Sequence, residues 1–346
     1  MLVSELVQLM KIDSTSGKEM ELANFIAGNL HQPGAALETH DVGDGTMNLF
    51  YRWGSPEIIF CTHLDTVPPY LEPVAERNMV SGRGACDAKG QITTAWNVCR
   101  ELYREGETNF GLLLVAGEET GSKGAKVANN LIRDCKYVII GEPTENRLIK
   151  AGKGIQLYDV QITGIGCHSG YPQYGDSAIE GMRVFLNLLS GMEFPIDQVL
   201  GPTTFNIGML ASDNACNVLP DLVTFSLYIR TTFASHDLIE NALRSIAGEK
   251  TSIARVREDK PFEYYHPDGF DSDIVAFGCD GPSLTNLGKC LLYGPGSIRT
   301  AHTDNEHIHI KDIEKAISDL KIIYKILKAE LEQNDCNEIR RDIRQG

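Results

Sequence analysis

The sequence predicts an α/β protein: a mixed, mostly parallel sheet with helices on both faces, and an inserted α+β domain. Three short strands, residues 58–62, 112–116 and 137–140, are apolar on both faces and alternate with helical segments. Strands of this kind are typical of parallel sheets covered by helices. At about residue 154 the pattern changes to strands that alternate between apolar and polar residues, which indicates a second domain.

The composition of the chain limits its partners and its location. The formal net charge of −15 argues against nucleic acids and anionic membranes as partners. No apolar run approaches the ~20 residues of a membrane span, and the first residues resemble an amphipathic helix rather than a signal peptide. The nine cysteines form no CxxC pair, so we expect reduced thiols and a cytoplasmic protein.

The first part of the chain alternates helices and strands in an order that favours the parallel sheet. Residues 17–32 place apolar side chains at helical spacing, and residues 47–53 form a strand before the apolar strand at 58–62. Apolar side chains recur on one helical face over residues 89–105, and another helix is expected near residues 122–133. These two helices separate the apolar strands, as crossovers between parallel strands require.

The middle of the chain predicts a compact α+β domain. Its elements are a strand at 154–164, a helix at 176–190, strands at 203–211 and 221–231, a helix at 236–247 and a strand at 251–258. This β-α-β-β-α-β order is that of ferredoxin-like domains. We therefore expect a first domain formed by residues 1–153 and 263–346, and a separate domain of residues 154–262.

The last part of the chain continues the first domain. A helix is expected near residues 271–279, before a short strand at 290–293. A Gly-rich loop then carries Arg299 and His302, and a helix over residues 311–333 has apolar side chains along one stripe. The loop therefore places a histidine after another apolar strand.

Polar side chains follow the three apolar strands of the first part. His63 and Asp65 end the first strand, Glu118 and Glu119 follow the second, and Glu142 follows the third. Open α/β sheets bind ligands at the carboxyl ends of their strands. A lone histidine there is more often structural, although Asp65 could orient His63 as a metal ligand. The adjacent glutamates repel each other unless a cation or proton lies between them, so one could bind a metal and the other act as a base.

Two further candidates lie in glycine-rich loops. Asp87, in GRGACDAKG, precedes a helix and could either cap it or bind a metal. His302 lies in RTAHTDNEHIHI, and we prefer it as a ligand to His307 and His309, which would share one face of a strand. The loops and strand ends then supply two imidazoles and up to four carboxylates, which suits zinc, with cobalt or manganese as substitutes. Five ligands with one bridging carboxylate would fit two metals about 3.5–4 Å apart.

Seven motifs occur in the order known from one family of metal-dependent hydrolases. They are HLDTVP, GRGACDAKG, GEETGSKGA, GEPT, GCHSGYPQYGDSAI, NVLPD and AHTDNE. Over nearly its whole length the chain resembles the zinc-dependent exopeptidase and deacylase family that includes acetylornithine deacetylase, succinyl-diaminopimelate desuccinylase, aminoacylase and carboxypeptidase G. The resemblance implies that residues 154–262 form a lid and dimerisation domain, and that the protein is a homodimer.

The resemblance also implies a site for two zinc ions per subunit. Asp87 would bridge the ions, His63 and Glu142 would complete one site, and Glu119 and His302 would complete the other.

Further roles follow from the same resemblance. Glu118 would be the general base, and Asp65 would orient His63. His168 matches a histidine that enters the partner subunit's active site in dimeric relatives and stabilises the oxyanion. The resemblance also implies three substrate-binding residues, two in the inserted domain and one in the first domain. Asn217 and Arg230 would contact the substrate's carboxylate, and Gly296 would lie in a loop near the substrate.

The function implied by these residues is hydrolysis of an amide bond by metal-activated water. The first candidate is a dinuclear-metal deacylase that acts on an N-acyl amino acid, like acetylornithine deacetylase. The alternative is a di- or tripeptidase of the same family, which would cleave unblocked short peptides instead. A non-catalytic amino-acid-binding protein is a third hypothesis, which loss of the base or of a metal ligand would favour.

Overall fold

The computed structural model describes residues 2–30 and 32–345, with side chains up to residue 334. The chain divides into two compact units. The first, called here the large unit, contains Met1–Lys150, Tyr264–Asp273 and Cys279–Gly346. The second, called the inserted unit, contains Ala151–Glu263 and Ile274–Gly278.

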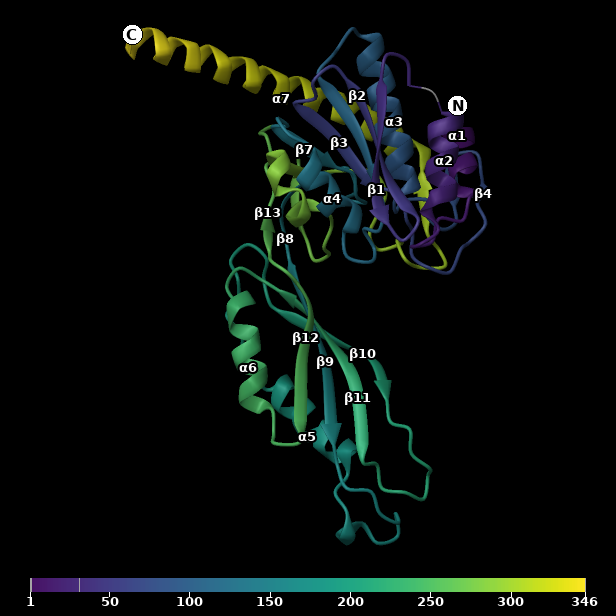
Figure 1. Ribbon diagram of the computed structural model, residues 1–346, viewed down its shortest axis with the longest axis vertical. Coiled ribbons are helices and arrows are strands. Elements are labelled where there is room, and N and C mark those ends of the chain that lie inside the picture. Colours follow the sequence, from purple (N-terminus) through teal and green to yellow (C-terminus); the bar gives the residue numbers. More distant parts are fainter. Residues whose placement is uncertain (1, 31, 346) are drawn as a thin grey trace. The chain divides into compact units, whose positions relative to one another are not determined.

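The large unit is built on a six-stranded sheet with the order β1-β2-β6-β3-β7-β15 (Figure 1). Its strands are β1 (Ala36–Gly43), β2 (Thr46–Trp53), β3 (Ile58–His63), β6 (Phe110–Val115), β7 (Tyr137–Ile140) and β15 (Lys289–Leu292). β3 pairs in parallel with β6 and β7, and β15 pairs in parallel with β7. β2 is antiparallel to β1 and β6. The predicted α/β fold with a mixed, mostly parallel sheet is therefore confirmed.

Helices cover both faces of this sheet, which is why its central strands are apolar throughout. The helices of the large unit are α1 (Leu2–Met10), α2 (Glu19–Asn29), α3 (Lys89–Arg104), α4 (Lys123–Leu131) and α7 (Ile310–Gln345). Ile58 and Phe60 of β3 share one core with α1, α2, α3 and α7. Ile59 and Cys61 are equally buried and point to the opposite face, because side chains alternate along a strand. α4 lies outside the first core, on that opposite side.

Two small three-stranded sheets accompany the six-stranded sheet. One has the order β16-β5-β4, with β4 at Val74–Ala75, β5 at Met79–Ser81 and β16 at His307–His309. The other has the order β13-β8-β14, with β8 at Leu148–Gly152, β13 at Phe262–Glu263 and β14 at Ser272–Val275. The short 3₁₀ helices are η1 (Pro172–Tyr174), η2 (His236–Leu238), η3 (Gly281–Ser283) and η4 (Thr285–Leu287).

The prediction of a helix near residues 271–279 is wrong, because part of this segment forms β14 (Ser272–Val275). The backbone of the segment pairs with β8: the Leu148 amide donates to the Asp271 carbonyl at 3.0 Å, and the Lys153 amide donates to the Val275 carbonyl at 3.0 Å. Sheet pairing with a distant strand has overridden a weak local helix pattern. The last helix is longer than the predicted range of 311–333, since α7 continues to Gln345 without an intervening glycine or proline.

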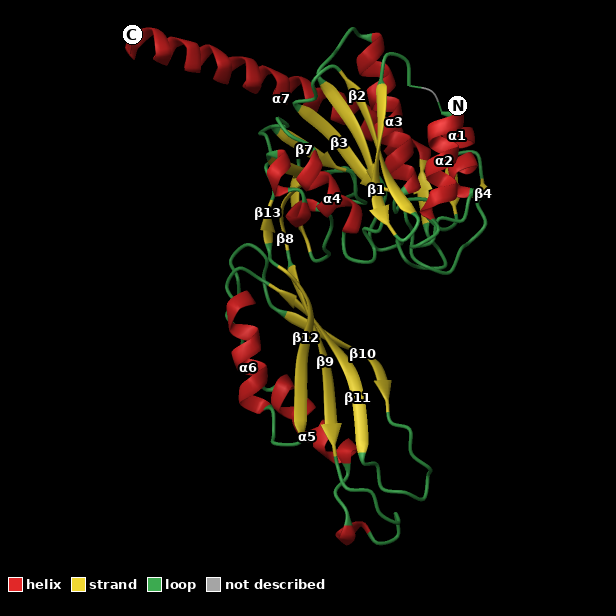
Figure 2. Ribbon diagram, in the orientation of Figure 1, coloured by secondary structure: helices red, strands yellow, loops and turns green. Residues whose placement is uncertain are grey.

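The inserted unit contains a four-stranded antiparallel sheet with the order β10-β11-β9-β12 (Figure 2). Its elements are β9 (Gly154–Thr163), α5 (Ala178–Ser190), β10 (Thr204–Ala211), β11 (Leu222–Thr231), α6 (Ile239–Ile246) and β12 (Thr251–Asp259). Alternate residues of β11 are buried and pack with Phe185 of α5 and Leu243 of α6 in a separate core. The helices thus cover one face of the sheet, and the role of this unit as a lid or dimerisation module stays a prediction.

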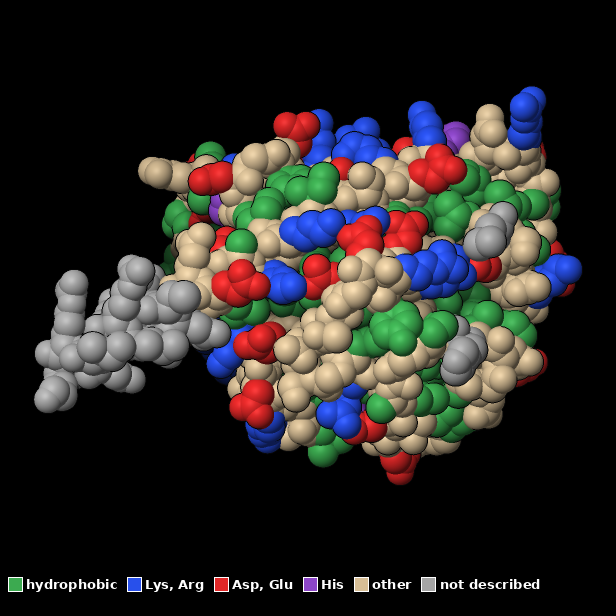
Figure 3. Space-filling model, turned by 90° about the horizontal axis from the view of Figure 1, so that it is seen from above, with side chains coloured by type: hydrophobic (Ala, Val, Ile, Leu, Met, Phe, Trp, Pro, Cys, Tyr) green, Lys and Arg blue, Asp and Glu red, His purple; other side chains and the backbone are tan. Residues whose placement is uncertain are grey.

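The surface carries charges of both signs. On the face in Figure 3, basic and acidic side chains lie side by side between patches of hydrophobic side chains. Lys321 of α7, for example, contacts Glu101 and Glu105 near the end of α3 at 2.7 and 2.6 Å. Within the described part of the chain, no helix combines the length and the hydropathy needed to cross a bilayer.

Candidate metal centre

The candidate residues of the large unit meet at one edge of its central sheet. His63 is the last residue of β3, Glu118 and Glu119 lie in the turn after β6, and Glu142 follows β7 by two residues. The three strands are parallel, so their carboxyl ends share an edge. His302 reaches the same place from the loop after β15.

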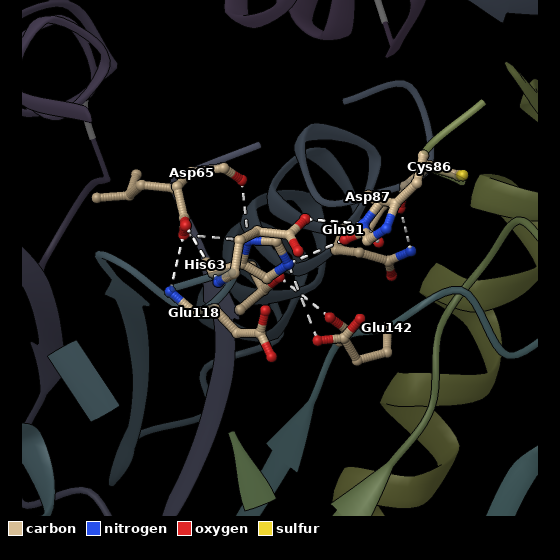
Figure 4. A network of polar contacts seen from close by, with 12 residues as sticks. His63, Asp65, Cys86, Asp87, Gln91, Glu118 and Glu142 are labelled. Carbon is tan, nitrogen blue, oxygen red and sulfur yellow. Dashed lines mark hydrogen bonds and ion pairs between the residues drawn. The ribbon is translucent and has the colours of Figure 1, made fainter. Parts of the chain in front are cut away.

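Asp87 lies between the two histidines. His63 Nε2 is 2.9 Å from Asp87 Oδ1, and His302 Nε2 is 3.2 Å from Asp87 Oδ2. Glu142 Oε1 is 3.9 Å from His63 Nε2, and Glu119 Oε1 is 2.9 Å from His302 Nε2. Figure 4 shows His63 between Asp65 on one side and Asp87 and Glu142 on the other. Each oxygen of Asp87 therefore faces a different imidazole, which is the arrangement a bridging carboxylate needs.

The donor atoms are close enough to hold metal ions. Three overlapping groups, each with donors within 4.8 Å of one another, are His63–Asp87–Glu142, Asp87–Glu119–His302 and His63–Glu118–Glu119. Asp87 belongs to the first two groups, so those two share one carboxylate. Mixed imidazole and carboxylate donors suit zinc and its common substitutes. The residues present thus fit a divalent metal, although the metal role of each residue stays a proposal.

The electrostatics of the metal-free site also favour a cation. Burial and the nearby Asp87 carboxylate raise the pKa of Glu142 well above its usual value. Burial likewise raises the pKa of Glu118 well above normal, with Glu119 adding to the shift. These carboxylates are held near one another away from water, and a divalent cation would stabilise their ionised forms.

In the histidines a raised pKa favours the charged form, because carboxylates surround the imidazoles. Burial opposes the charged form of His63, but its contacts with Asp65 and Asp87 outweigh burial and raise its pKa. Hydrogen bonds to Asp87 and Glu119 raise the pKa of His302 to about 10. For Asp87 itself, burial is outweighed by His302 and His63, so its pKa is lowered. The surrounding carboxylates thus favour the protonated form of both imidazoles when no metal is bound.

Asp65 supports three parts of the site at once. The Nδ1 of His63 lies 2.9 Å from the Asp65 carbonyl oxygen and 3.4 Å from its Oδ1. The amides of Glu118 and Glu119 donate to Asp65 Oδ1 and Oδ2 at 3.0 and 3.1 Å, and Ser16 Oγ donates to Oδ2 at 2.9 Å. Asp65 is fully buried, so it fixes the imidazole and the two-glutamate turn relative to each other.

Two alternatives left open by the sequence can be compared with this geometry. α3 has Ala88 as its N-cap residue and no side-chain capping bond, so Asp87 is directed to the histidines instead of the helix end. His307 and His309 do share a strand face, with ring centroids 5.5 Å apart in β16. Neither of them joins any of the three donor groups found among the described residues.

Four buried polar residues around the site were missed by sequence reasoning. Glu306 accepts hydrogen bonds from the amides of Cys86 and Asp87, both at 3.2 Å, and pairs with Arg83 at 2.6 Å. Gln91 donates to the carbonyls of Cys86 and Pro295 at 2.8 and 2.7 Å (Figure 4).

The fourth residue is Asp280, which is buried and whose Oδ1 has no hydrogen-bond partner among the described residues. Burial raises its pKa to about 6. Arg83 and Glu306 lie in polar motifs, Gln91 lies in the first turn of α3, and Asp280 directly precedes η3. Their burial depends on contacts with distant segments, so no local signal in the sequence marks them.

Gly296 lies in the large unit, against the turn that carries Asp87. Its φ is +85°, and a Cβ at this position would lie only 2.6 Å from the Cβ of Cys86. The loop therefore approaches the turn closely because residue 296 has no side chain. A role in substrate binding stays a proposal.

The other predicted residues belong to the inserted unit. His168 and Asn217 are exposed and lie on paired segments: His168 bridges to Val218, and the Ser169 amide donates to the Asn217 carbonyl at 2.9 Å. Arg230 is near the end of β11, with its guanidinium 4.8 Å from the ring centre of Tyr228. Its buried Nη1 has no hydrogen-bond partner among the described residues.

The chain matches known proteins along most of its length. Residues 59–325 match the model of the peptidase family M20/M25/M40. A peptidase M20 domain-containing protein of Schizosaccharomyces pombe is 33% identical over 333 residues, which cover 92% of this chain and 83% of the relative. The chain belongs to the peptidase family M20/M25/M40. The resemblance to zinc exopeptidases and deacylases is thereby confirmed.

Other relatives of this M20-family protein have peptidase names. A "probable carboxypeptidase" of Aspergillus fumigatus is 30% identical over 386 residues, covering 94% of this chain and 86% of the relative. The solved structure of a tripeptidase from Staphylococcus aureus has the same fold, with a TM-score of 0.75 at 20% identity, covering 94% of this chain and 97% of that one. The M20-family protein is a hydrolase of amide or peptide bonds, and its family implies a divalent metal.

Proposed function

We propose that the protein removes an amino acid with a free α-carboxylate from a short peptide, using a divalent metal and Glu118 as the general base. Hydrolysis of an N-acyl amino acid, as by acetylornithine deacetylase, is the second candidate. The observation that carries the proposal is the shared position of Asp87 between two donor groups, with Glu118 beside them. The peptide is placed first because two similar relatives, 33% and 30% identical, carry peptidase names.

The chemistry follows from the residues at the edge of the sheet. A bound divalent metal supplies Lewis-acid activation of water and of the scissile carbonyl. We assign the metal to His63, Asp87, Glu119, Glu142 and His302, with two zinc ions as first choice and cobalt or manganese as substitutes. Glu118 accepts a proton from the attacking water and returns it to the leaving nitrogen, which departs as an amine. Asp65 keeps the backbone of Glu118 in place during these transfers.

Arg230 supports a substrate with a free carboxylate. Its buried Nη1 has no hydrogen-bond partner in the part of the chain that the structure describes, and leaving a buried charged donor unpaired costs free energy. A carboxylate could accept hydrogen bonds from this guanidinium in a forked arrangement. Both the C-terminal residue of a peptide and an N-acyl amino acid offer that group.

We extend the proposal to a homodimer in which residues of both subunits act. Asn217 precedes β11, whereas Arg230 lies near its end, eight residues after Leu222. At the ~3.3 Å rise of a strand, Leu222 and Arg230 are about 26 Å apart. Asn217 lies before Leu222, so we infer that a small substrate does not contact both Asn217 and Arg230 within one inserted unit. We therefore assign His168 and Asn217 to the partner subunit's substrate and Arg230 to the substrate of its own subunit.

The edge of the inserted unit's sheet has the composition of a contact surface. β10 is an edge strand, and its Phe205, Met209 and Leu210 are 42, 86 and 56% exposed. Exposed apolar edge strands tend to pair with another chain. The expected mass in light scattering is that of two chains, and a monomer at micromolar concentration would contradict this assignment. The free state of the eight described cysteines fits the predicted cytoplasmic location.

A substrate panel tests the function. Purified protein loaded with zinc, cobalt or manganese is incubated with di- and tripeptides, N-acetyl and N-succinyl amino acids, and the C-terminal amide of each compound. Release of the C-terminal amino acid from the free-carboxylate compounds is expected. No release from any compound with any metal would refute the proposed function, and release from acylated amino acids alone would select the second candidate.

Two variants test the assigned roles in the same assay. Glu118→Gln should keep its metal while activity falls by about 10²- to 10⁴-fold, because a general base is lost. Loss of metal in that variant would make Glu118 a ligand, as the His63–Glu118–Glu119 group would allow. Arg230→Gln should raise KM for free-carboxylate substrates only. Arg257→Gln is the matched control, because Arg257 already pairs with Asp259.

A further inference from the structure

A buried ion pair lies behind the proposed bridging residue. Arg83 Nη1 is 2.6 Å from Glu306 Oε2, and the side chains are only 2% and 0% exposed. The second oxygen of Glu306 accepts from the backbone amides of Cys86 and Asp87, both at 3.2 Å. Glu306 therefore joins a buried guanidinium to the turn that presents the Asp87 carboxylate, although 219 residues separate Glu306 from Asp87 along the chain.

The same pair connects the loops that carry the other donors. Arg83 Nε donates to the Pro69 carbonyl at 3.2 Å, six residues after His63. Arg83 Nη1 also donates at 3.3 Å to the carbonyl of Thr303, the residue after His302. One guanidinium thus contacts the segment after His63, the segment of His302 and, through Glu306, the turn of Asp87.

We propose that Glu306, held by Arg83, is the positioning residue that fixes the Asp87 carboxylate between His63 and His302. Among the described residues, the polar contacts of the Glu306 side chain are with Arg83 and with the Cys86–Asp87 turn, and none is with a side-chain donor atom of the proposed centre. Glu306 acts on the Asp87 backbone. Because Glu306 holds the Asp87 amide, the Asp87 side chain can point in few other directions. The inference rests on the proposed metal centre for its meaning, but the contacts that carry it are present without a metal.

Glu306 accepts hydrogen bonds from two kinds of donor, the Arg83 guanidinium and the two backbone amides, and this permits a rescue experiment. In Glu306→Gln the single amide oxygen can face either Arg83 or the two backbone amides. The charged guanidinium makes the stronger hydrogen bond, so the side-chain NH₂ is left facing the amides of Cys86 and Asp87. Replacing Arg83 by Met in the same chain removes this competitor and lets the glutamine oxygen return to the amides. E306Q should therefore be impaired. R83M/E306Q should recover in part, because losing the guanidinium also leaves the Pro69 and Thr303 carbonyls without their donor.

The first measurement uses metal-free protein and hydrogen exchange. Peptides that cover residues 82–90 should exchange faster in E306Q than in the wild type, and the rate should return toward wild type in R83M/E306Q. Glu5→Gln is the matched control, since it neutralises a glutamate that faces Arg100 and Asn97 away from this turn. Exchange of residues 82–90 in the control should equal that of the wild type. Equal exchange in E306Q and the wild type overturns the proposal.

The second measurement uses Co²⁺ as the probe. Its affinity, from competition with a chelator, should fall about 10- to 100-fold in E306Q, as for other residues that orient metal ligands, and its visible spectrum should change. Both should recover in part in R83M/E306Q, to values between those of E306Q and the wild type, and stay at wild-type values in E5Q. Failure of the double variant to recover would mean that Glu306 contributes to stability alone, which also overturns the proposal.

Two further outcomes keep the inference distinguishable from the proposed function. If the wild type binds no Co²⁺, the metal centre is refuted, and hydrogen exchange still tests whether Glu306 orders the turn. If E306Q does not fold, Arg83→Lys replaces it, because one ammonium cannot contact Glu306 and both carbonyls together. Exchange over residues 82–90 should then rise, and unchanged exchange in R83K refutes the positioning role.

Discussion

Asp65 offers the sharpest test of how the centre is supported. In Asp65→Asn the Oδ1 can still accept from the Glu118 amide, while an NH₂ group replaces the oxygen that accepts from the Glu119 amide. Ser16 can turn its hydroxyl to accept from the new donor, but a backbone amide cannot. The variant therefore loses one hydrogen bond to a charged acceptor and places two donors against each other.

The size of the effect follows from that single loss. A hydrogen bond to a charged group contributes about 1.5–3 kcal/mol, which is a factor of about 10 to 150 in an equilibrium constant. In the proposed mechanism, the turn of Glu118 and Glu119 must be ordered for both metal binding and proton transfer. We therefore expect Co²⁺ affinity and kcat/KM each to fall about 10- to 100-fold, in the range known for residues that orient metal ligands.

The assay compares Asp65→Asn with a matched control. Asp44→Asn removes a carboxylate that is 81% exposed and pairs with Lys123 at the surface, so it should change nothing measurable. Urea denaturation reports stability, chelator competition reports Co²⁺ affinity, and the substrate panel reports kcat/KM. Wild-type affinity and turnover in D65N would refute the argument that this carboxylate orders the turn. An equal loss in D44N would show that the effect is not specific to the site.

Three further predictions concern other parts of the molecule. The pKa of His302 is raised from 6.5 to about 10. Its contribution to the stability of the folded state is therefore complete below pH 6.5 and is lost as pH rises toward 10. The urea midpoint of metal-free protein should fall over that pH window, and it should fall less in His302→Gln. Gly296→Ala places a Cβ 2.6 Å from Cys86 at φ +85°, so its thermal midpoint should drop by several degrees, whereas an unchanged midpoint would mean that the loop moves freely. Mixed dimers of His168→Ala and Glu118→Gln subunits should regain part of the activity that each homodimer lacks, and no recovery in verified heterodimers would contradict action across subunits.

The fold could be predicted where the pattern of apolar residues is strong. β3, β6 and β7 are buried on both faces, and their apolar runs stand out in the sequence. β1 was missed because ALETHDVG is mostly exposed and polar at the edge of the sheet. The local sequence of β14 predicts a helix, because its strand character depends on pairing with β8 and no local pattern encodes that pairing.

The candidate site divides in the same way. His63, Glu118, Glu119 and Glu142 follow buried strands, so parallel pairing alone predicts that they converge. The convergence of Asp87 and His302 was expected from the family motifs. Buried partners such as Glu306 could not be predicted, because a glutamate in a polar loop is usually exposed. Glu306 is buried through its ion pair with Arg83, which is distant in the sequence.

The unequal exposure of the donors has a consequence for metal supply. His63, Asp87 and Glu142 are all buried, whereas His302 is 45% exposed at the other end of the shared carboxylate. An ion on the buried side would leave slowly, and an ion on the His302 side would exchange with the surrounding solution. Purified enzyme should then carry one retained and one exchangeable ion. Its activity should depend on the free metal concentration because the exchangeable position, on the His302 side, must be refilled from solution.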